Sequence, residues 1–263
     1  MKECEPINLL WTGGWDSTFR LVYLLLVKQK PVQTYYLIDT VRNSTNFEFS
    51  AMREIKNQLV KKYPHTKDML LPNIFKEVQD IRPNKLITDS YNRMLQEEHW
   101  GTQYEWLARF ANEEGIKDLE LCVQKSGSQR NNEMINYFRS INDGDDILYK
   151  VDDKFIGTDF YEIFKYYVFP VMSFSKLDMW NILKEKGVNE FLEFTWFCHK
   201  PRPNGKPCGD CVPCSLVIKQ GLSRRLPFMS RLTYYLGINR RFRNGLQKLP
   251  RLHSMLKFIK HKV

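Results

Sequence analysis

The segment INLLWTGGWDST, residues 7–18, sets the architecture that the rest of the chain follows. Residues 7–11 are mostly apolar and predict a short buried strand, while the two glycines and two hydroxyls of residues 12–17 predict a tight turn. Apolar side chains then recur at helical spacing over residues 18–30, until Pro31 ends the pattern. A strand that leads through a glycine-rich turn into a helix is typical of an α/β fold.

The same alternation of strands and helices continues along the chain. Runs rich in β-branched and aromatic residues predict strands, and apolar side chains at helical spacing predict helices. The expected elements are strands at 32–38 and 119–123 and helices at 48–63, over most of 92–114, and at 175–186, where Ser175 caps the helix and Gly187 ends it. We therefore expect a doubly wound, mostly parallel sheet with its ligand at the carboxyl ends of the strands.

The turn at residues 12–17 has the composition of an anion site. Gly13 and Gly14 let the backbone approach an anion closely, and the dipole of the following helix favours negative charge there. Ser17 adds a hydroxyl donor. Asp16 would repel a bare phosphate, so its presence indicates either bound Mg²⁺ or an orienting role in the loop. No Gly-Lys-Ser/Thr follows, which excludes a Walker A loop.

These residues resemble a known signature. Thr12-Gly13-Gly14-Trp15-Asp16-Ser17 is similar to the Ser-Gly-Gly-x-Asp-Ser motif of the PP-loop ATP-pyrophosphatases, with Thr12 retaining the hydroxyl of the serine. The resemblance implies an adenine nucleotide alpha hydrolase-like fold that binds ATP with Mg²⁺ at residues 12–17. It also implies cleavage between the α- and β-phosphates and transfer of AMP to a substrate oxygen, with Asp16 and Ser17 in catalytic roles. The alternative is an ordinary tight turn.

A second resemblance lies downstream. Pro170 and the segment Ser173-Phe174-Ser175-Lys176-Leu177 resemble the later Pro–Lys segment of the same family, which implies that Lys176 approaches the ATP phosphates. A cation at the start of a helix is slightly unfavourable against the helix dipole, which supports a function for Lys176. The alternative is a solvated lysine.

Other candidates near the loop have two interpretations each. Asp39 ends the second expected strand and would bind Mg²⁺ or the ribose of ATP, or else serve as a turn residue. Trp11 and Trp15 flank the loop and would stack on a base or pack in the core. Arg130 and Asn131 follow a Ser-Gly-Ser turn and would reach the pocket or remain solvated.

A cysteine cluster follows the last expected helix. Cys198, Cys208, Cys211 and Cys214 lie within seventeen residues, and closely spaced cysteines supply the four thiolates that tetrahedral Zn²⁺ prefers. We expect a structural zinc site, with a redox dithiol or free cysteines as the alternatives. His199 could replace one of the four ligands.

The cluster also resembles part of one PP-loop family. Thr195-Trp196-Phe197-Cys198 and the segment from Cys208 to Cys214 are similar to the C-terminal zinc segment of the 7-cyano-7-deazaguanine synthases. This implies an ATP-dependent C–N ligase that converts a carboxy-deazaguanine and ammonia into a nitrile. The matching motifs lie at the two ends of residues 7–214. The acceptor could instead be a protein or nucleic acid, or the chain could be a nucleotide-binding subunit without activity.

Charge separates the end of the chain from its body. Twelve basic residues and no acidic residue follow Asp210, so the remainder has 28 basic against 30 acidic residues although the whole chain has a net charge of +10. We expect three segments: an ATP-binding domain at 1–195, a zinc segment at 196–218 and a basic, helical tail at 219–263. The partner of the tail could be the body, another subunit as in a homodimer, nucleic acid or an acidic protein, and the alternative is a solvated helical face.

Two absences bear on location. No apolar run is long enough to span a membrane, and the N-terminus lacks the apolar core of a secretory signal. We expect a cytoplasmic protein.

Overall fold

The computed structural model describes residues 5–97, 100–124, 135–144 and 146–236. The chain divides into two compact units, residues 1–196 and residues 197–263. The first unit contains the central sheet and most of the helices.

The central sheet has five strands in the order β3-β2-β1-β4-β7, and every neighbouring pair is parallel. Strand β1 lies in the middle, where Leu9 pairs with Thr34 of β2 on one side and with Glu120 of β4 on the other. The strands are β1 Ile7–Leu10, β2 Val32–Ile38, β3 Ile74–Glu77, β4 Leu119–Glu120 and β7 Tyr167–Val168. The expected α/β fold with a mostly parallel sheet is confirmed.

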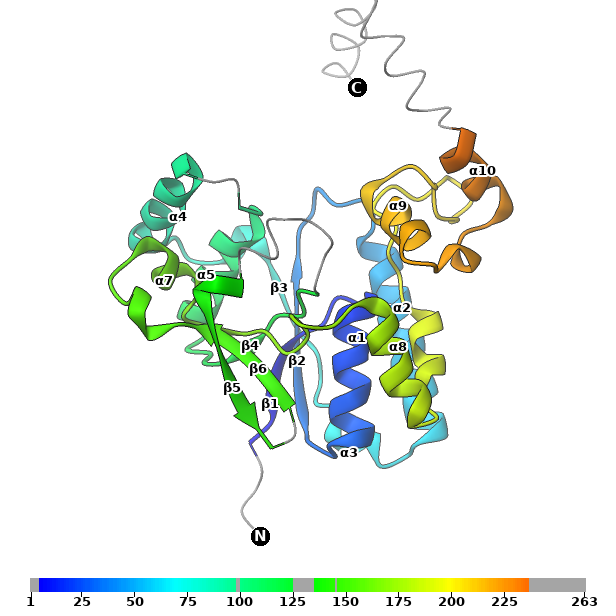
Figure 1. The fold of residues 1–263 in the computed structure, drawn as a ribbon, viewed down its shortest axis with the longest axis horizontal. Helices are drawn as coiled ribbons and strands as arrows, with labels where there is room; N and C mark the ends of the chain where they lie inside the picture. Colours follow the sequence, from blue (N-terminus) through cyan, green and yellow to red (C-terminus); the bar gives the residue numbers. More distant parts are fainter. Residues whose placement is uncertain (1–4, 98–99, 125–134, 145, 237–263) are drawn as a thin grey trace, which may run out of the picture. The chain divides into compact units, whose positions relative to one another are not determined.

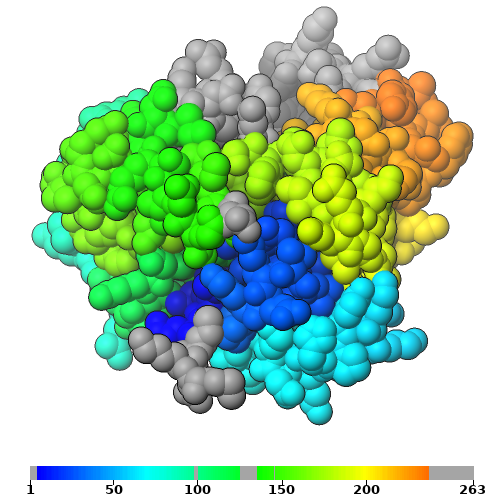
Figure 2. Space-filling model, turned by 60° about the horizontal axis from the view of Figure 1, so that its bottom comes forward, coloured from blue at the N-terminus to red at the C-terminus, as the bar shows by residue number. Residues whose placement is uncertain are grey.

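Helices lie on both sides of this sheet (Figure 1). One side carries α1 Trp15–Val22, which continues as a π-helix over Tyr23–Val27, with α2 Thr45–Lys62 and α8 Lys176–Glu185. The other side carries α4 Lys85–Glu97, α5 Gln103–Glu113 and α7 Asp159–Phe164. Helices α1 and α8 lie side by side, blue and yellow in Figure 2. Among the described residues of this unit, the remaining elements are helix α3 Thr66–Met69, the hairpin of β5 Phe138–Asp143 and β6 Asp146–Val151, and 3₁₀ turns at Val78–Asp80, Ile135–Tyr137, Asp153–Phe155 and Asn189–Phe194.

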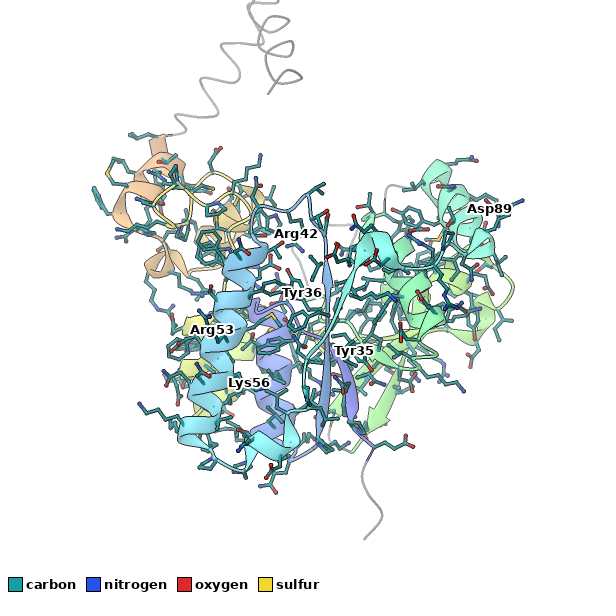
Figure 3. All side chains as sticks on the ribbon, turned by 180° about the vertical axis from the view of Figure 1, so that it is seen from behind. Tyr35, Tyr36, Arg42, Arg53, Lys56 and Asp89 are labelled. Atoms are coloured by element: carbon teal, nitrogen blue, oxygen red, sulfur yellow. The ribbon has the colours of Figure 1, made fainter. Side chains whose placement is uncertain are left out.

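The side chains of β2 pack against the helices on both sides of the sheet. Tyr35 and Leu37 belong to the apolar core that includes α5 and α7, whereas Tyr36 turns to the other side, toward α2 (Figure 3). Successive side chains of a strand point to opposite faces of the sheet. A strand that is buried on both faces therefore has an almost continuously apolar sequence. This explains why residues 32–38 are recognisable as a strand in the sequence.

Two expected helices differ in their bounds. Helix α1 begins at Trp15 and not at Thr18, so Asp16 and Ser17 lie in its first turn. In place of the one helix expected over most of residues 92–114, the structure has two helices, α4 and α5, because Trp100 and Gly101 are not helical. The Ser175 cap is confirmed: its Oγ accepts a hydrogen bond from the backbone N–H of Asp178, whose carboxylate accepts from the Ser175 N–H.

A buried ion-pair network ties α1 to the sheet and to the β5–β6 hairpin. Arg20 of α1 donates to both carboxylate oxygens of Glu120, at 2.8 and 2.7 Å, and to Asp146 at 3.1 Å. Burial alone would lower the pKa of Arg20, but these two carboxylates raise it above its usual value. Tyr23 and Lys28 also contact Asp146, each at 2.9 Å. The network therefore links α1, β4 and the β5–β6 hairpin.

In the second unit, the described helices are α9 Val212–Lys219 and α10 Phe228–Leu236, with a 3₁₀ turn at Ser223–Arg225 between them. The part of the expected tail beyond residue 236 lies outside the described residues. None of the described helices of either unit has the length and apolar composition that crossing a membrane requires.

Candidate functional site

The loop between β1 and α1 is held in one tight conformation. Gly13 has φ +66°, and a Cβ at this position would lie 2.9 Å from Met52 Cγ and 3.0 Å from the Glu48 carbonyl oxygen. Any side chain at position 13 would therefore combine a left-handed backbone with a clash against α2. Glycine at this point lets the loop pack against α2.

Hydrogen bonds fix the two ends of this loop. Ser17 Oγ accepts from the Thr12 backbone N–H at 3.3 Å and lies 3.4 Å from Thr12 Oγ1. The Gly13 carbonyl accepts from the backbone N–H of Trp196 at 2.9 Å. Trp11 anchors the end of β1, because its Nε1 donates to Thr18 Oγ1 at 3.1 Å. The loop is therefore preorganised by its own hydroxyls and by the last residue of the first unit.

Asp16 and Lys176 meet at the start of two helices. Lys176 Nζ donates to Asp16 Oδ1 at 2.6 Å, and their side chains are 13% and 24% exposed. Asp16 lies in the first turn of α1, and Lys176 is the first residue of α8. The structure thus brings together an acid and a cation that were proposed separately from the sequence. Such a pair can exchange partners, the acid for a metal ion and the ammonium for a phosphate.

A second cation lies beside the loop, and the sequence analysis missed it. Arg42 donates to Glu48 Oε1 at 2.7 Å, and the same carboxylate accepts from Ser44 Oγ and Tyr36 OH, each at 2.7 Å. Burial and Glu48 raise the pKa of Tyr36 above its usual value, so the phenol remains a donor. Glu48 therefore orients the Arg42 guanidinium in the pocket described next. The only signal in the sequence is that Arg42 follows shortly after the carboxyl end of a buried strand.

Asp16 and Arg42 line a pocket at the carboxyl ends of β1, β2 and β4, whereas Lys176 is not among its lining residues and contacts it through Asp16. The polar part of its wall consists of Thr12, Gly14, Trp15, Asp16, Ser17, Arg42, Gln103 and Cys122. The rest of its wall consists of Leu10, Leu37, Tyr104, Trp106, Leu107, Leu121 and Val123. The pocket wall therefore combines charged and hydroxyl groups with apolar and aromatic side chains, which suits a ligand with phosphates and a flat organic group.

Cys122 lies in this wall but is not an activated nucleophile. Burial, and then the nearby Glu120 carboxylate, raise the pKa of the Cys122 thiol well above its usual value. A thiol is a poor nucleophile when protonated, so covalent catalysis by Cys122 at neutral pH is disfavoured.

Several other residues that the sequence placed near the ligand do not lie in the pocket wall or lie mainly in the core. Gly13 packs against α2 and is not among the residues that line the pocket. Asp39 forms a turn, in which its Oδ1 accepts from the Val41 N–H at 3.2 Å, and it is not among the residues that line the pocket. Trp15 is 4% exposed and stacks on Trp180 with ring centroids 6.0 Å apart, so it packs in the core while one edge reaches the pocket. Arg130 and Asn131 lie outside the described residues.

In the second unit, four sulfur atoms converge. The Sγ atoms of Cys198, Cys208, Cys211 and Cys214 all lie within 4.8 Å of one another. Cys208 and Cys214 are separated by 3.8 Å, and Cys198 and Cys211 by 3.9 Å. Sulfurs bound to one tetrahedral zinc at about 2.3 Å are about 3.8 Å apart, so the cluster fits the metal. His199 is not part of the four-residue cluster.

Backbone donors surround the cluster. Cys208 N–H donates to Cys198 Sγ at 3.2 Å, and the N–H groups of Asp210 and Cys211 donate to Cys208 Sγ at 3.3 Å. These bonds stabilise thiolates and orient them. Gly209 has φ +82°, and a Cβ there would lie 2.0 Å from the Ser230 carbonyl oxygen. The cysteine turn therefore packs directly on α10.

No protein-family model matches this chain, and the search of curated proteins finds no match.

Proposed function

We propose that this chain is an ATP-dependent adenylating enzyme of the PP-loop type. It binds ATP at residues 12–17, cleaves it between the α- and β-phosphates, and transfers AMP to an oxygen of an acceptor. The observation that carries the proposal is the ion pair between Asp16 and Lys176, 160 positions apart, beside a glycine-rich loop at the carboxyl edge of a parallel sheet.

The residues divide into three tasks. The loop backbone and the Ser17 hydroxyl hold phosphate oxygens at the start of α1, where the helix dipole favours anions. Lys176 and Arg42 supply positive charge, which stabilises the pyrophosphate as it leaves. Asp16 is the residue placed to hold Mg²⁺, and that ion would neutralise the phosphate oxygens.

The step itself is a displacement at the α-phosphorus. An acceptor oxygen forms a bond to this phosphorus while the bond to the bridging oxygen of pyrophosphate breaks. No side chain needs to form a covalent intermediate, so the protein acts by positioning and by charge stabilisation. The protonated Cys122 thiol in the wall agrees with this assignment.

For the acceptor, we propose a flat heterocyclic carboxylate such as a carboxy-deazaguanine. The apolar and aromatic part of the pocket, with Trp106 and Leu107, supports a planar group. Ammonia would displace AMP from the acyl adenylate to give an amide. Adenylation of the amide oxygen by a second ATP and loss of AMP would leave a nitrile. The zinc site in the second unit has a structural role in this proposal, because four thiolates leave no open position for substrate.

The proposal is tested by acceptor-dependent release of pyrophosphate. Purified protein is incubated with ATP, Mg²⁺ and ammonia, with and without 7-carboxy-7-deazaguanine, and then with protein or nucleic acid as the acceptor. Stimulation by the deazapurine supports the small-molecule ligase. Stimulation only by a macromolecule assigns the same chemistry to another acceptor. ATP binding without pyrophosphate release under any condition would make the chain a nucleotide-binding subunit and would overturn the proposal.

A further inference from the structure

Helix α10 of the second unit exposes a continuous apolar face. Phe228, Met229, Tyr235 and Leu236 are between 47% and 67% exposed. Residues 228 and 235, like residues 229 and 236, are seven positions apart, which is two helical turns, so the four side chains lie on one side of the helix.

The opposite side of α10 is attached to the cysteine turn. Ser230 is buried, and its Oγ donates to the Pro207 carbonyl at 2.5 Å. Arg202 from the same turn donates to Thr233 Oγ1 at 2.9 Å. The helix therefore cannot rotate to bury its apolar face without giving up these contacts. In α9, Val212 and Leu216, one turn apart, are also exposed.

The charge of this unit is strongly one-sided. Residues 197–236 contain seven basic residues and a single acidic residue, Asp210. Residues 237–263 add eight basic residues and no acidic residue to the sequence. The first unit, in contrast, has 25 basic and 29 acidic residues. The positive charge of the chain is therefore concentrated in the unit that carries the exposed apolar face.

We infer that the second unit docks on an anionic lipid surface. Exposed aromatic and aliphatic side chains enter the boundary between headgroups and acyl chains, and Lys and Arg side chains of the same unit contact the lipid phosphates. This inference goes beyond the proposed function, because it concerns where the enzyme is held and not what it catalyses.

Other occupants fit these observations less well. A second copy of this face would bring two strongly positive surfaces together, which is unfavourable. A nucleic acid would satisfy the charge, but its phosphates offer nothing to the aliphatic side chains of Met229 and Leu236. An extended surface that is uniformly negative and apolar beneath matches both features.

The experiment is sedimentation of the full-length protein with vesicles. The protein should bind vesicles of phosphatidylcholine mixed with phosphatidylglycerol and should bind pure phosphatidylcholine at least tenfold more weakly. Added salt should weaken binding to the anionic vesicles, because the contribution of the basic side chains is screened. Lys219→Gln should weaken binding by roughly fivefold, the contribution expected for one basic residue near an anionic surface.

The decisive variant is Phe228→Ser/Tyr235→Ser. Both side chains are exposed, so the fold and the zinc content should be unchanged, while binding to anionic vesicles should fall at least tenfold. The matched control is Ile147→Ser/Ile156→Ser, which removes exposed apolar side chains from the first unit and should change nothing. Equal binding by the α10 variant and the wild type would overturn the inference. So would binding to a single-stranded oligonucleotide that exceeds vesicle binding and survives the α10 substitutions.

Discussion

The ammonium group of Lys176 lies 2.6 Å from the carboxylate of Asp16, so the first residue of α8 neutralises an acid in the first turn of α1. A cation at a helix start opposes the helix dipole, whereas an acid in the first turn, such as Asp16, is favoured by it. Lys176 is therefore unfavourable where it stands unless a carboxylate or another anion compensates its charge. In the proposed function, the Lys176 ammonium would exchange the Asp16 carboxylate for a phosphate, and the carboxylate would then be available to a metal ion.

The first prediction concerns this pair. Lys176→Met should lower the turnover of ATP by roughly a hundredfold or more, because a preorganised charge on the phosphates is lost. The free energy of unfolding should change by only about 1 kcal/mol, since partly exposed ion pairs contribute little. Lys184→Met, at an exposed position of the same helix, is the control and should leave turnover unchanged. Equal turnover in both variants would remove Lys176 from the site.

A second prediction separates backbone strain from steric clash in the loop. Gly13 and Gly115 both have positive φ, +66° and +62°, but only Gly13 has atoms within reach of a Cβ. Gly13→Ala should therefore destabilise the protein by about 1–2 kcal/mol more than Gly115→Ala, because α2 must shift. It should also weaken ATP binding, whereas Gly115→Ala should not. Denaturant unfolding and ATP titration measure the two effects, and identical losses for both variants would contradict the tight packing of the loop.

The third prediction tests the cation that the sequence analysis missed. Arg42→Gln should weaken ATP binding by about tenfold, the effect expected for the loss of one charge-assisted hydrogen bond. Arg53→Gln is the control, since Arg53 is an exposed arginine on α2 (Figure 3). Equilibrium titration with ATP and Mg²⁺ gives both affinities. If the two variants bind alike, Arg42 contacts Glu48 for structural reasons alone.

These three sites show what the sequence could and could not predict. The glycine-rich loop is local, so its strand, glycines and helix can be recognised in residues 7–30 of the sequence. The approach of Lys176 to Asp16 depends on the packing of α8 beside α1 and was not predicted, because the family resemblance indicated each residue separately. Arg42 lies in a polar connection between a strand and a helix, and such a sequence predicts an exposed loop. Its partner Glu48 belongs to the next helix, α2, so their contact could not be predicted from the connection alone.

The elements that the sequence analysis missed have a related cause. The β5–β6 hairpin is largely polar and partly exposed, so its sequence lacks the apolar runs that identify the buried strands. Conversely, the glycines at positions 13 and 14 led to the prediction of a turn that extends through Ser17. In the structure, helix α1 already begins at Trp15. Packing and capping, and not local propensity, set these boundaries.

The fourth prediction concerns metal in the second unit. Protein purified without added metal should contain about one zinc per chain, as the four converging sulfurs indicate. Cys211→Ser should lose the zinc and destabilise residues 197–236, because metal binding and folding are coupled. Cys122→Ser should keep the zinc, since this thiol lies in the other unit. Elemental analysis that finds no zinc in the wild-type protein would refute the site.

The fifth prediction is a pH dependence of stability. Burial would raise the pKa of Asp146, but hydrogen bonds from Lys28, Arg20 and Tyr23 outweigh it and hold the pKa below the ordinary value of 3.8. The stabilisation is therefore present above pH 3.8 and is lost as the pH falls through the pKa of the folded protein. Asp146→Asn should cost about 2–3 kcal/mol of unfolding free energy at neutral pH and flatten its acid dependence. Asp143→Asn, in the same hairpin but more exposed, should keep the wild-type profile.

The most direct test of the proposed chemistry follows the fate of ATP labelled in its α-phosphate. In the presence of Mg²⁺ and an acceptor, the wild-type protein should place the label in AMP, either directly or through an adenylated acceptor, and release unlabelled pyrophosphate. Asp16→Asn should abolish this product while retaining the fold. Label that appears in ADP, with release of orthophosphate, would show cleavage at the γ-phosphate and would contradict the assignment of this protein as an adenylating enzyme.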